Sequence, residues 1–179
     1  YDPITGNFTH IPYDPSNPQG LSSSYVTSIS EDKYGFYWIG TENGINRLNP
    51  ENGIVTHIFE NPEDPFGLRS NDIREVLVSQ TGDLWVASYK SGLQIYDIEE
   101  NRFHYFNIDT NSVEDETING IYEDQTGTLW IHTYNYGFFA FRIIDHTIES
   151  VNHYLHDPKN VNSLSYNLVS YIVRLSIKY

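Results

Sequence analysis

The stretch "EDKYGFYWIGT" at residues 31–41 decides the fold, because related stretches occur twice more in the chain. It returns as "VSQTGDLWVAS" at residues 78–88 and as "EDQTGTLWIHT" at residues 123–133. The second tryptophan lies 47 residues after the first, and the third lies 45 residues after the second. A period of this size indicates a repeated structural unit.

Each unit holds four short apolar segments that alternate with turns rich in Gly, Asn, Asp and Pro. In the first unit these segments cover approximately residues 25–30, 36–41, 44–49 and 54–60. They are too short for ordinary helices, and their Val, Ile, Tyr, Phe and Trp content favours strands. In the first strand Val26 and Ile29 lie three residues apart, a spacing that a β-bulge would accommodate.

Four antiparallel strands every 45 or so residues are typical of a β-propeller blade. The sequence therefore predicts an all-β fold, a β-propeller fragment of four-stranded antiparallel blades with three full blades and two partial ones. The predicted division is residues 1–18 (last strand of a preceding blade and linker), 19–66, 67–113 and 114–160 (full blades), and 161–179 (first strand of a further blade). Because one repeat cannot bury its faces alone, we expect the remaining blades of the propeller to be partners of this chain.

The residues that recur between units have structural roles in this interpretation. An Asp carboxylate accepts hydrogen bonds from backbone amides in a turn, Gly adopts the positive φ that closes the turn, and Trp fills the wedge between two sheets. We assign these roles to Asp32, Gly35, Trp38, Gly82, Trp85, Asp124, Gly127 and Trp130. In the second unit Ser79 replaces the Asp, and a hydroxyl is a weaker cap.

Composition limits the classes of partner and chemistry. The chain has 24 acidic and 10 basic side chains and a formal net charge of −14, so it repels phosphate backbones and we expect no nucleic-acid partner. Cysteine is absent, which excludes disulfides and thiolate metal ligands. Histidines and carboxylates form no catalytic pattern, so we expect no catalytic residue, metal site or cofactor. Because methionine is absent even at position 1, we interpret the chain as a piece of a longer protein.

Candidate ligand-binding residues lie in and beside the turns between the second and third strand of each unit. Variable loops on a fixed scaffold are common sites of recognition. Aromatic rings beside amide and charged groups suit sugars, whose C–H faces stack on rings while their hydroxyls form hydrogen bonds. The candidates are Glu42, Asn43, Tyr89, Lys90, His132, Tyr134, Asn135 and Tyr136. The alternative is that these tyrosines only cover the rim.

The pattern V-x-x-I-x-E-D-x-x-G-x-x-W-I-G-T-x-x-G-I-x-R-L, from Val26 to Leu48, resembles the two-component regulator propeller repeat. The linkers "DPSNPQGLSSSYV" (14–26) and "NPEDPFGLRSNDI" (61–73) strengthen the resemblance, while "VAS" at 86–88 and His132 depart from it. The resemblance implies the periplasmic sensor domain of a Bacteroidetes hybrid two-component regulator, part of an inner-membrane protein. Such a domain detects glycan fragments, with an oligosaccharide as ligand, and regulates a histidine kinase that lies outside this chain.

Two other functions stay open. A propeller glycosidase or polysaccharide lyase would need carboxylates that converge on one face, and a scaffold propeller would need no small ligand. Exposed strand edges at the two ends could also pair between two copies of the chain, so a homodimer stays open as well.

Overall fold

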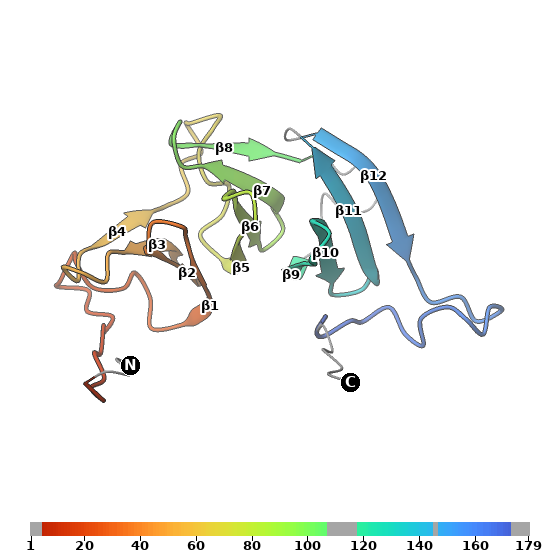
Figure 1. Ribbon diagram of the computed structural model, residues 1–179, viewed down its shortest axis with the longest axis horizontal. Helices are drawn as coiled ribbons and strands as arrows, with labels where there is room; N and C mark the ends of the chain where they lie inside the picture. Colours follow the sequence, from red (N-terminus) through yellow and green to blue (C-terminus); the bar gives the residue numbers. More distant parts are fainter. Residues whose placement is uncertain (1–4, 107–117, 145–146, 173–179) are drawn as a thin grey trace.

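Three four-stranded antiparallel sheets follow one another along the chain (Figure 1). They are seen in the computed structural model, which describes residues 5–106, 118–144 and 147–172. Blade 1 contains β1 (Val26–Glu31), β2 (Tyr37–Thr41), β3 (Gly44–Leu48) and β4 (Val55–Ile58). Blade 2 contains β5 (Ile73–Val78), β6 (Leu84–Ser88), β7 (Gly92–Asp97) and β8 (Arg102–Tyr105). Blade 3 contains β9 (Ile118–Glu123), β10 (Thr128–Thr133), β11 (Phe138–Ile144) and β12 (Thr147–Tyr154).

Strands that are adjacent in sequence are adjacent in each sheet, so the predicted all-β propeller fragment is confirmed. The predicted bulge is confirmed as well. The pairing of β5 with β6 shifts register between Ile73 and Glu75, and equivalent shifts occur in β1 and β9. Because of this extra residue, Ile73 and Val76 both point into the core although they lie three residues apart.

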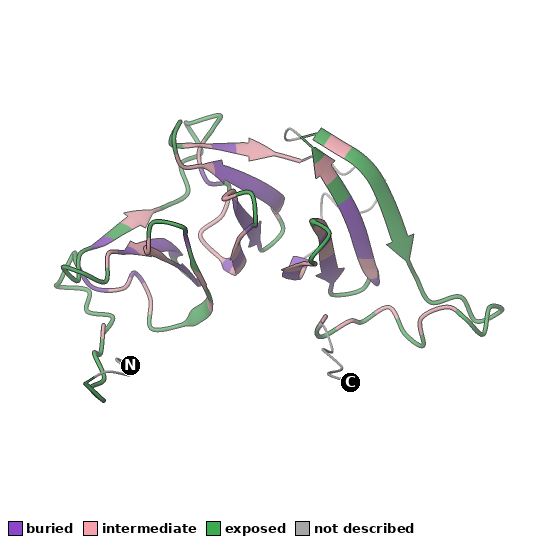
Figure 2. Ribbon diagram, viewed as in Figure 1, coloured by how far each residue is buried: buried purple, intermediate pink, exposed green. Residues whose placement is uncertain are grey.

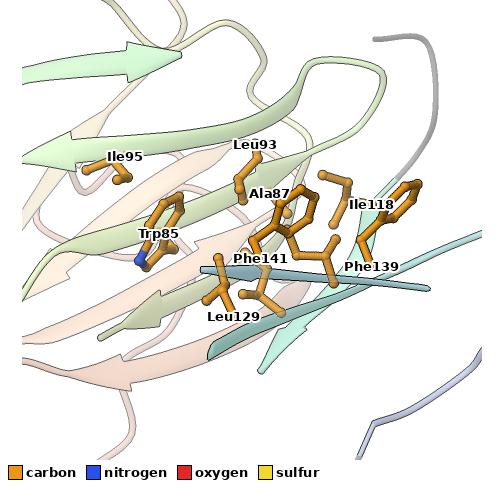
Figure 3. Close-up of a cluster of buried hydrophobic side chains, with 10 residues drawn as sticks. Trp85, Ala87, Leu93, Ile95, Ile118, Leu129, Phe139 and Phe141 are labelled. Atoms are coloured by element: carbon orange, nitrogen blue, oxygen red, sulfur yellow. The ribbon is translucent and has the colours of Figure 1, made fainter. Parts of the chain in front are cut away.

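Blades 1 and 2 each bury their tryptophan against the blade that follows. Trp38 packs on Val76 and Leu84 of blade 2, and it is only 1% exposed. Trp85 packs on Leu129 and other apolar side chains of blade 3 (Figure 3). Buried residues accordingly concentrate in the middle strands, whereas β12 is exposed along most of its length (Figure 2).

Hydroxyl groups join the innermost strands of blades 1 and 2. The backbone amides of Val76 and Val78 each donate a hydrogen bond of 2.8 Å, to Ser28 Oγ and Ser30 Oγ respectively. These bonds satisfy amides on β5 that its sheet leaves unpaired, because β5 forms the inner edge of blade 2.

The two terminal segments differ from the prediction. The sequence predicts the last strand of a preceding blade within residues 1–18 and the first strand of a further blade within residues 161–179; in their described parts, 5–18 and 161–172, there is no strand apart from the isolated bridge of Tyr13 with Leu21. A strand needs a neighbour for its backbone hydrogen bonds, and no strand of the three sheets pairs with either segment. Residues 173–179, part of the predicted last strand, lie outside the described residues. No helix long and apolar enough to cross a membrane occurs in the part of the chain that the structure describes.

Candidate functional site

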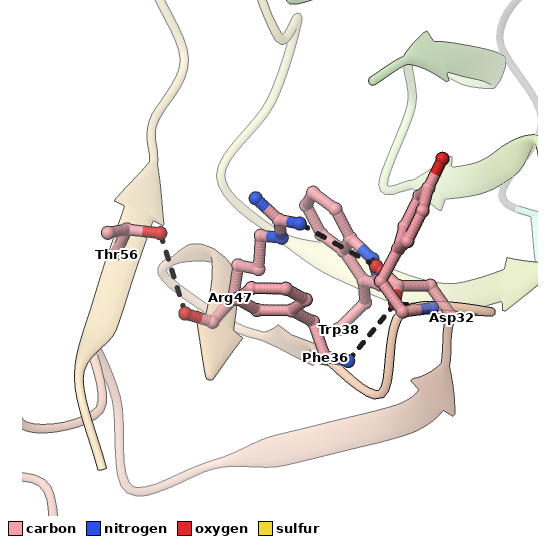
Figure 4. A network of polar contacts seen from close by, with 6 residues as sticks. Asp32, Phe36, Trp38, Arg47 and Thr56 are labelled. Atoms are coloured by element: carbon pink, nitrogen blue, oxygen red, sulfur yellow. Dashed lines mark hydrogen bonds and ion pairs between the residues drawn. The ribbon is translucent and has the colours of Figure 1, made fainter. Parts of the chain in front are cut away.

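The turn between the first two strands of blade 1 is organised by a buried carboxylate (Figure 4). Asp32 Oδ1 accepts hydrogen bonds from the backbone amides of Tyr34 and Phe36 at 2.9 and 3.0 Å. Asp32 Oδ2 accepts a bond from Trp38 Nε1 at 3.0 Å and lies 3.8 Å from the Arg47 guanidinium. The carboxylate therefore ties the turn, the inter-blade tryptophan and strand β3 together.

Blade 3 repeats this arrangement. Asp124 accepts hydrogen bonds from the amides of Thr126 and Thr128 and from Trp130 Nε1. Burial raises the pKa of Asp124, but these hydrogen bonds outweigh that effect and hold the pKa at about 2. The glycines that close the three turns all have positive φ: Gly35, Gly82 and Gly127. The group at Asp124 is therefore an ionised cap at neutral pH, and it has no proton to donate to a substrate.

Blade 2 lacks the carboxylate. Ser79 Oγ accepts a hydrogen bond from the Asp83 amide at 3.1 Å and lies 2.7 Å from Thr81 Oγ1, so the turn still closes. Trp85 Nε1 has no hydrogen-bond partner among the described residues, and it is not one of the atoms that are both buried and unpaired. The three turns therefore share a backbone conformation, but only the turns of blades 1 and 3 provide a carboxylate that accepts the N–H of the tryptophan.

The turns between the second and third strands of blades 1 and 2 expose part of the candidate residues. Glu42 and Asn43 are exposed, and Asn43 Nδ2 donates to the carbonyl of Ser22 at 3.0 Å. In blade 2 the ring of Tyr89 is 38% exposed. The ammonium of Lys90 lies 5.2 Å from the centre of this ring, and Lys90 has a positive φ of 55°.

The same turn in blade 3 separates its candidate residues. Tyr134 is 55% exposed and Asn135 is exposed, whereas Tyr136 is half-buried. The carbonyl of Tyr136 lies 2.8 Å from His153 Nε2, so this residue is held from β12.

His132 does not lie with the exposed candidates. It is 7% exposed, and its Nδ1 lies 2.7 Å from the carbonyl of Val169. Burial lowers the pKa of His132, and the bond to that carbonyl only partly opposes the effect. Gly120 lies opposite His132 in β9, and a Cβ at Gly120 would stand 2.3 Å from His132 Nε2. The imidazole of His132 thus occupies the space that a side chain at position 120 would take, and its bond to Val169 attaches the segment that follows blade 3.

Within the described residues, no hydrogen bond or ring contact joins these turns of different blades. In blades 1 and 3, the turn between the second and third strands is instead hydrogen-bonded to the linker that follows the same blade. The amide of Gly44 donates to the carbonyl of Asn71 at 2.6 Å, and that of Gly137 donates to the carbonyl of Asn167 at 2.8 Å. The side chains of these two asparagines close the linkers, because each accepts a backbone amide bond. The shared Asn in "RSNDI" and "SYNLV" is the sequence signal that could have found these contacts.

Two fully buried amides were also not expected from the sequence. Asn46 Oδ1 accepts the amide of Ser22 at 2.8 Å, and Gln94 Oε1 accepts the amide of Arg69 at 3.2 Å. Each amide joins the third strand of a blade to the linker that precedes that blade. In blade 3 the equivalent position is Phe139.

One cluster of potential metal ligands stands at the hairpin between β7 and β8. Ligand atoms of Asp97, Glu100 and His104 lie within 4.8 Å of one another. The guanidinium of Arg102 forms an ion pair with Glu100, so a cation already neutralises one of the three groups. The cluster is exposed or half-buried and gives no geometry that selects a metal.

Two segments of the chain, residues 20–43 and 112–135, match the family described as "Two component regulator propeller". Each segment ends in the turn that carries the candidate residues, Glu42 and Asn43 in blade 1 and Tyr134 and Asn135 in blade 3. Among curated proteins, no sequence matches the chain.

Solved structures share the fold. The extracellular domain of the hybrid two-component system BT4673 from B. thetaiotaomicron is 18% identical, with a TM-score of 0.59 over 83% of this chain and 24% of that one. Virginiamycin B lyase from Staphylococcus aureus is 17% identical, with a TM-score of 0.53 over 73% of this chain and 41% of the lyase. The chain thus spans about a quarter of the first domain. At these sequence identities the comparison shows a shared fold, and it does not show a shared activity.

Proposed function

The chain carries two-component regulator propeller repeats, and on this premise we propose that it is part of the extracytoplasmic sensor propeller of a hybrid two-component regulator. The ligand is a glycan fragment, and the signal passes to a histidine kinase outside these residues. The parent protein is then anchored in the inner membrane, with this part in the periplasm and the other blades as its partners. The observation that carries the proposal is the family match in two repeats, one at each end of the three-blade array.

The exposed aromatic turns support glycan binding. Tyr134 and Tyr89 present rings to solvent on neighbouring blades, and Asn135 adds amide donors and acceptors beside one of them. The guanidinium of Arg74 lies 4.9 Å from the centre of the Tyr89 ring, so a donor stands beside the ring. A ring for the sugar face and polar groups for its hydroxyls are the two elements that such a site needs.

Signalling follows from a difference in affinity. A ligand that contacts these turns changes the balance between two arrangements of the sensor only if it binds one arrangement more tightly. In this proposal the two arrangements are those of a sensor dimer. The glycan binds one of them more tightly, and the resulting shift between them changes the activity of the kinase.

Calorimetry of the sensor propeller that contains this chain, titrated with neutral and acidic oligosaccharides, tests the proposal. We expect saturable heat with one class of glycan and about tenfold weaker binding after Tyr134→Ala, because loss of a stacked ring removes about 1–2 kcal/mol. Tyr34→Ala is the matched control, since Tyr34 is equally exposed but lies in the turn between β1 and β2, at the opposite end of its blade. Absence of heat with every glycan would leave a scaffold propeller as the better description.

An enzymatic propeller is the second candidate, since the lyase from Staphylococcus aureus shares the fold. Incubation of the same protein with polysaccharides, followed by chromatography of the products, separates the two functions. A sensor binds its glycan and leaves it intact, whereas the release of shorter fragments would favour a glycosidase or lyase.

A further inference from the structure

Blade 2 leaves an indole N–H without the acceptor that its neighbours provide. Asp32 and Asp124 accept the N–H of their own blade's tryptophan at 3.0 and 2.8 Å. At the equivalent position Ser79 ends one bond beyond Cβ and uses its Oγ within the turn. Trp85 Nε1 therefore has no hydrogen-bond partner among the described residues; the residue is 4% exposed, and it lines the wall of a cavity.

A cavity opens at this position. It has a volume of about 520 Å³ and lies between blades 2 and 3, where the β5–β6 and β9–β10 turns stand. Its lining includes the polar side chains of Ser79, Thr81, Asp83, Trp85, Glu123, Thr126 and Arg142. The volume falls within the range of about 300–1,000 Å³ that is usual for small-molecule sites. In Figure 3 the nitrogen of Trp85 lies on the side of the ring that faces away from Phe139, so it points out of the apolar cluster.

The polar groups of the cavity are held in place by the turn. Thr81 Oγ1 donates to Asp83 Oδ2 at 2.6 Å, and the amide of Gln80 donates to Glu123 Oε2 at 2.7 Å across the two blades. These bonds fix two carboxylates that can still accept hydrogen bonds from a ligand, because each oxygen has more than one lone pair. A cavity with positioned acceptors and one indole donor at its wall suits a molecule that both donates and accepts hydrogen bonds.

Charge favours a neutral occupant. Two carboxylates, of Asp83 and Glu123, face the cavity against one guanidinium, and Arg142 is already 3.3 Å from Glu149. The whole chain carries a formal charge of −14, so an anion would be repelled here as well. Hydroxyl groups fit the set, since each can accept from the indole and donate to a carboxylate.

We propose that this cavity binds a neutral monosaccharide unit, and that a sugar hydroxyl accepts the Trp85 N–H at the place that an Asp fills in the other two blades. The site lies at the opposite ends of the strands from the turns with Tyr89 and Tyr134, so it is separate from the candidates that the sequence indicates. The choice of a sugar rests on the proposed function, while the cavity and its unpaired donor do not.

Nuclear magnetic resonance of the ¹⁵N-labelled chain tests the site, because it resolves one indole N–H signal for each tryptophan. D-Glucose, D-galactose, D-mannose and D-xylose are titrated one at a time, with D-glucuronate as the anionic comparison. We expect a saturable shift of the Trp85 signal, assigned by its loss in Trp85→Phe, with at least one neutral sugar. The signals of Trp38 and Trp130 should stay in place, because carboxylates already accept their N–H groups.

Ser79→Asp is the decisive variant, because it places the missing carboxylate beside the indole and into the cavity. Binding should weaken about tenfold or more, since the donor is then occupied. Unchanged Trp38 and Trp130 signals will show that the variant folds, and Glu51→Gln, in an exposed turn of blade 1, is the matched control that retains binding.

The remaining outcomes overturn the inference. An unmoved Trp85 signal with all four neutral sugars means that water alone fills the cavity. A shift with D-glucuronate only, or an equal shift in Ser79→Asp, contradicts the assigned chemistry. Calorimetric heat of glycan binding with an unmoved Trp85 signal would remove this site and leave the proposed function intact.

Discussion

Glu75 is a carboxyl group whose titration is set by burial. It lies in β5 opposite Ala87, and burial raises its pKa from 4.5 to about 7. Because the folded pKa exceeds the unfolded one, ionisation of this group opposes folding. Its cost is absent below about pH 4.5, grows as the pH rises to about 7, and stays constant above that value.

Glu75→Gln should therefore stabilise the chain at pH 8 and have little effect at pH 4. We expect the free energy of unfolding at pH 8 to rise by about 1–2 kcal/mol, which allows for partial solvent exposure. Urea denaturation at the two pH values measures the change, with the exposed Glu51→Gln as control. A loss of stability at pH 8 would mean that the carboxylate has partners that favour its charge.

For single residues, the sequence predicted some structural roles and missed others. Spacing alone predicted that Asp32 and Gly35 form a turn and that Trp38 packs between blades, because each role follows from one residue type. It did not predict the bond from the indole to the carboxylate, which depends on side-chain direction. The sequence places His132 among the candidate ligand-binding residues, and its close contact with β9 depends on Gly120, which lies opposite in the sheet and distant in the sequence.

The third strands of blades 1 and 2 each contain a buried side-chain amide that binds the linker before the blade. Gln94 is fully buried, and it accepts the amide of Arg69 and donates to Ser88 Oγ at 3.0 Å. It therefore joins β7 both to the neighbouring strand and to the linker before blade 2. A polar residue in the middle of an apolar strand was overlooked because its partner is distant in the sequence.

Gln94→Leu should destabilise blade 2, because it leaves the amide of Arg69 and the hydroxyl of Ser88 without a partner. The expected cost is about 2–3 kcal/mol, the penalty for buried polar groups that lose their hydrogen bonds. Thermal unfolding followed by circular dichroism measures it, and Gln125→Leu in an exposed turn is the control. If both variants unfold at the same temperature, the amide does not hold the linker.

The burial of each of the three tryptophans depends on whether a further blade covers it. Trp38 is 1% exposed and Trp85 4%, because each is covered by the next blade. Trp130 is half-buried, and its ring contacts are with Phe138 and Tyr154 of its own blade. The same residue type therefore has two environments within one array.

Trp38→Ala should accordingly cost more than Trp130→Ala. We expect about 3–5 kcal/mol for the first, as for other large buried side chains, and about half of that for the second. Urea denaturation of both variants provides the comparison. Equal costs would show that Trp130 is covered as completely as Trp38.

Periodicity was sufficient to predict the architecture, since a blade is specified by residues close together in sequence. Residues 1–18 and 161–179 are each predicted to hold one strand, and their described parts, 5–18 and 161–172, form none. Pairing requires a second strand, and that information is not contained in the segment itself.

The close approach of His132 to Gly120 bears on how such arrays change over evolutionary time. The equivalent pairs are Ser28 with Gly40 in blade 1 and Glu75 with Ala87 in blade 2, so each blade combines a larger residue with a small one. Any side chain at Gly120 would collide with the imidazole, whose nitrogen stands 2.3 Å from that position. Recombination that replaced β9 alone with the first strand of blade 1 or 2 would put Ser or Glu opposite His132 and produce a clash, whereas duplication of a whole blade would not. A change at Gly120 therefore requires a compensating change at His132, and duplication of a whole blade preserves both residues together.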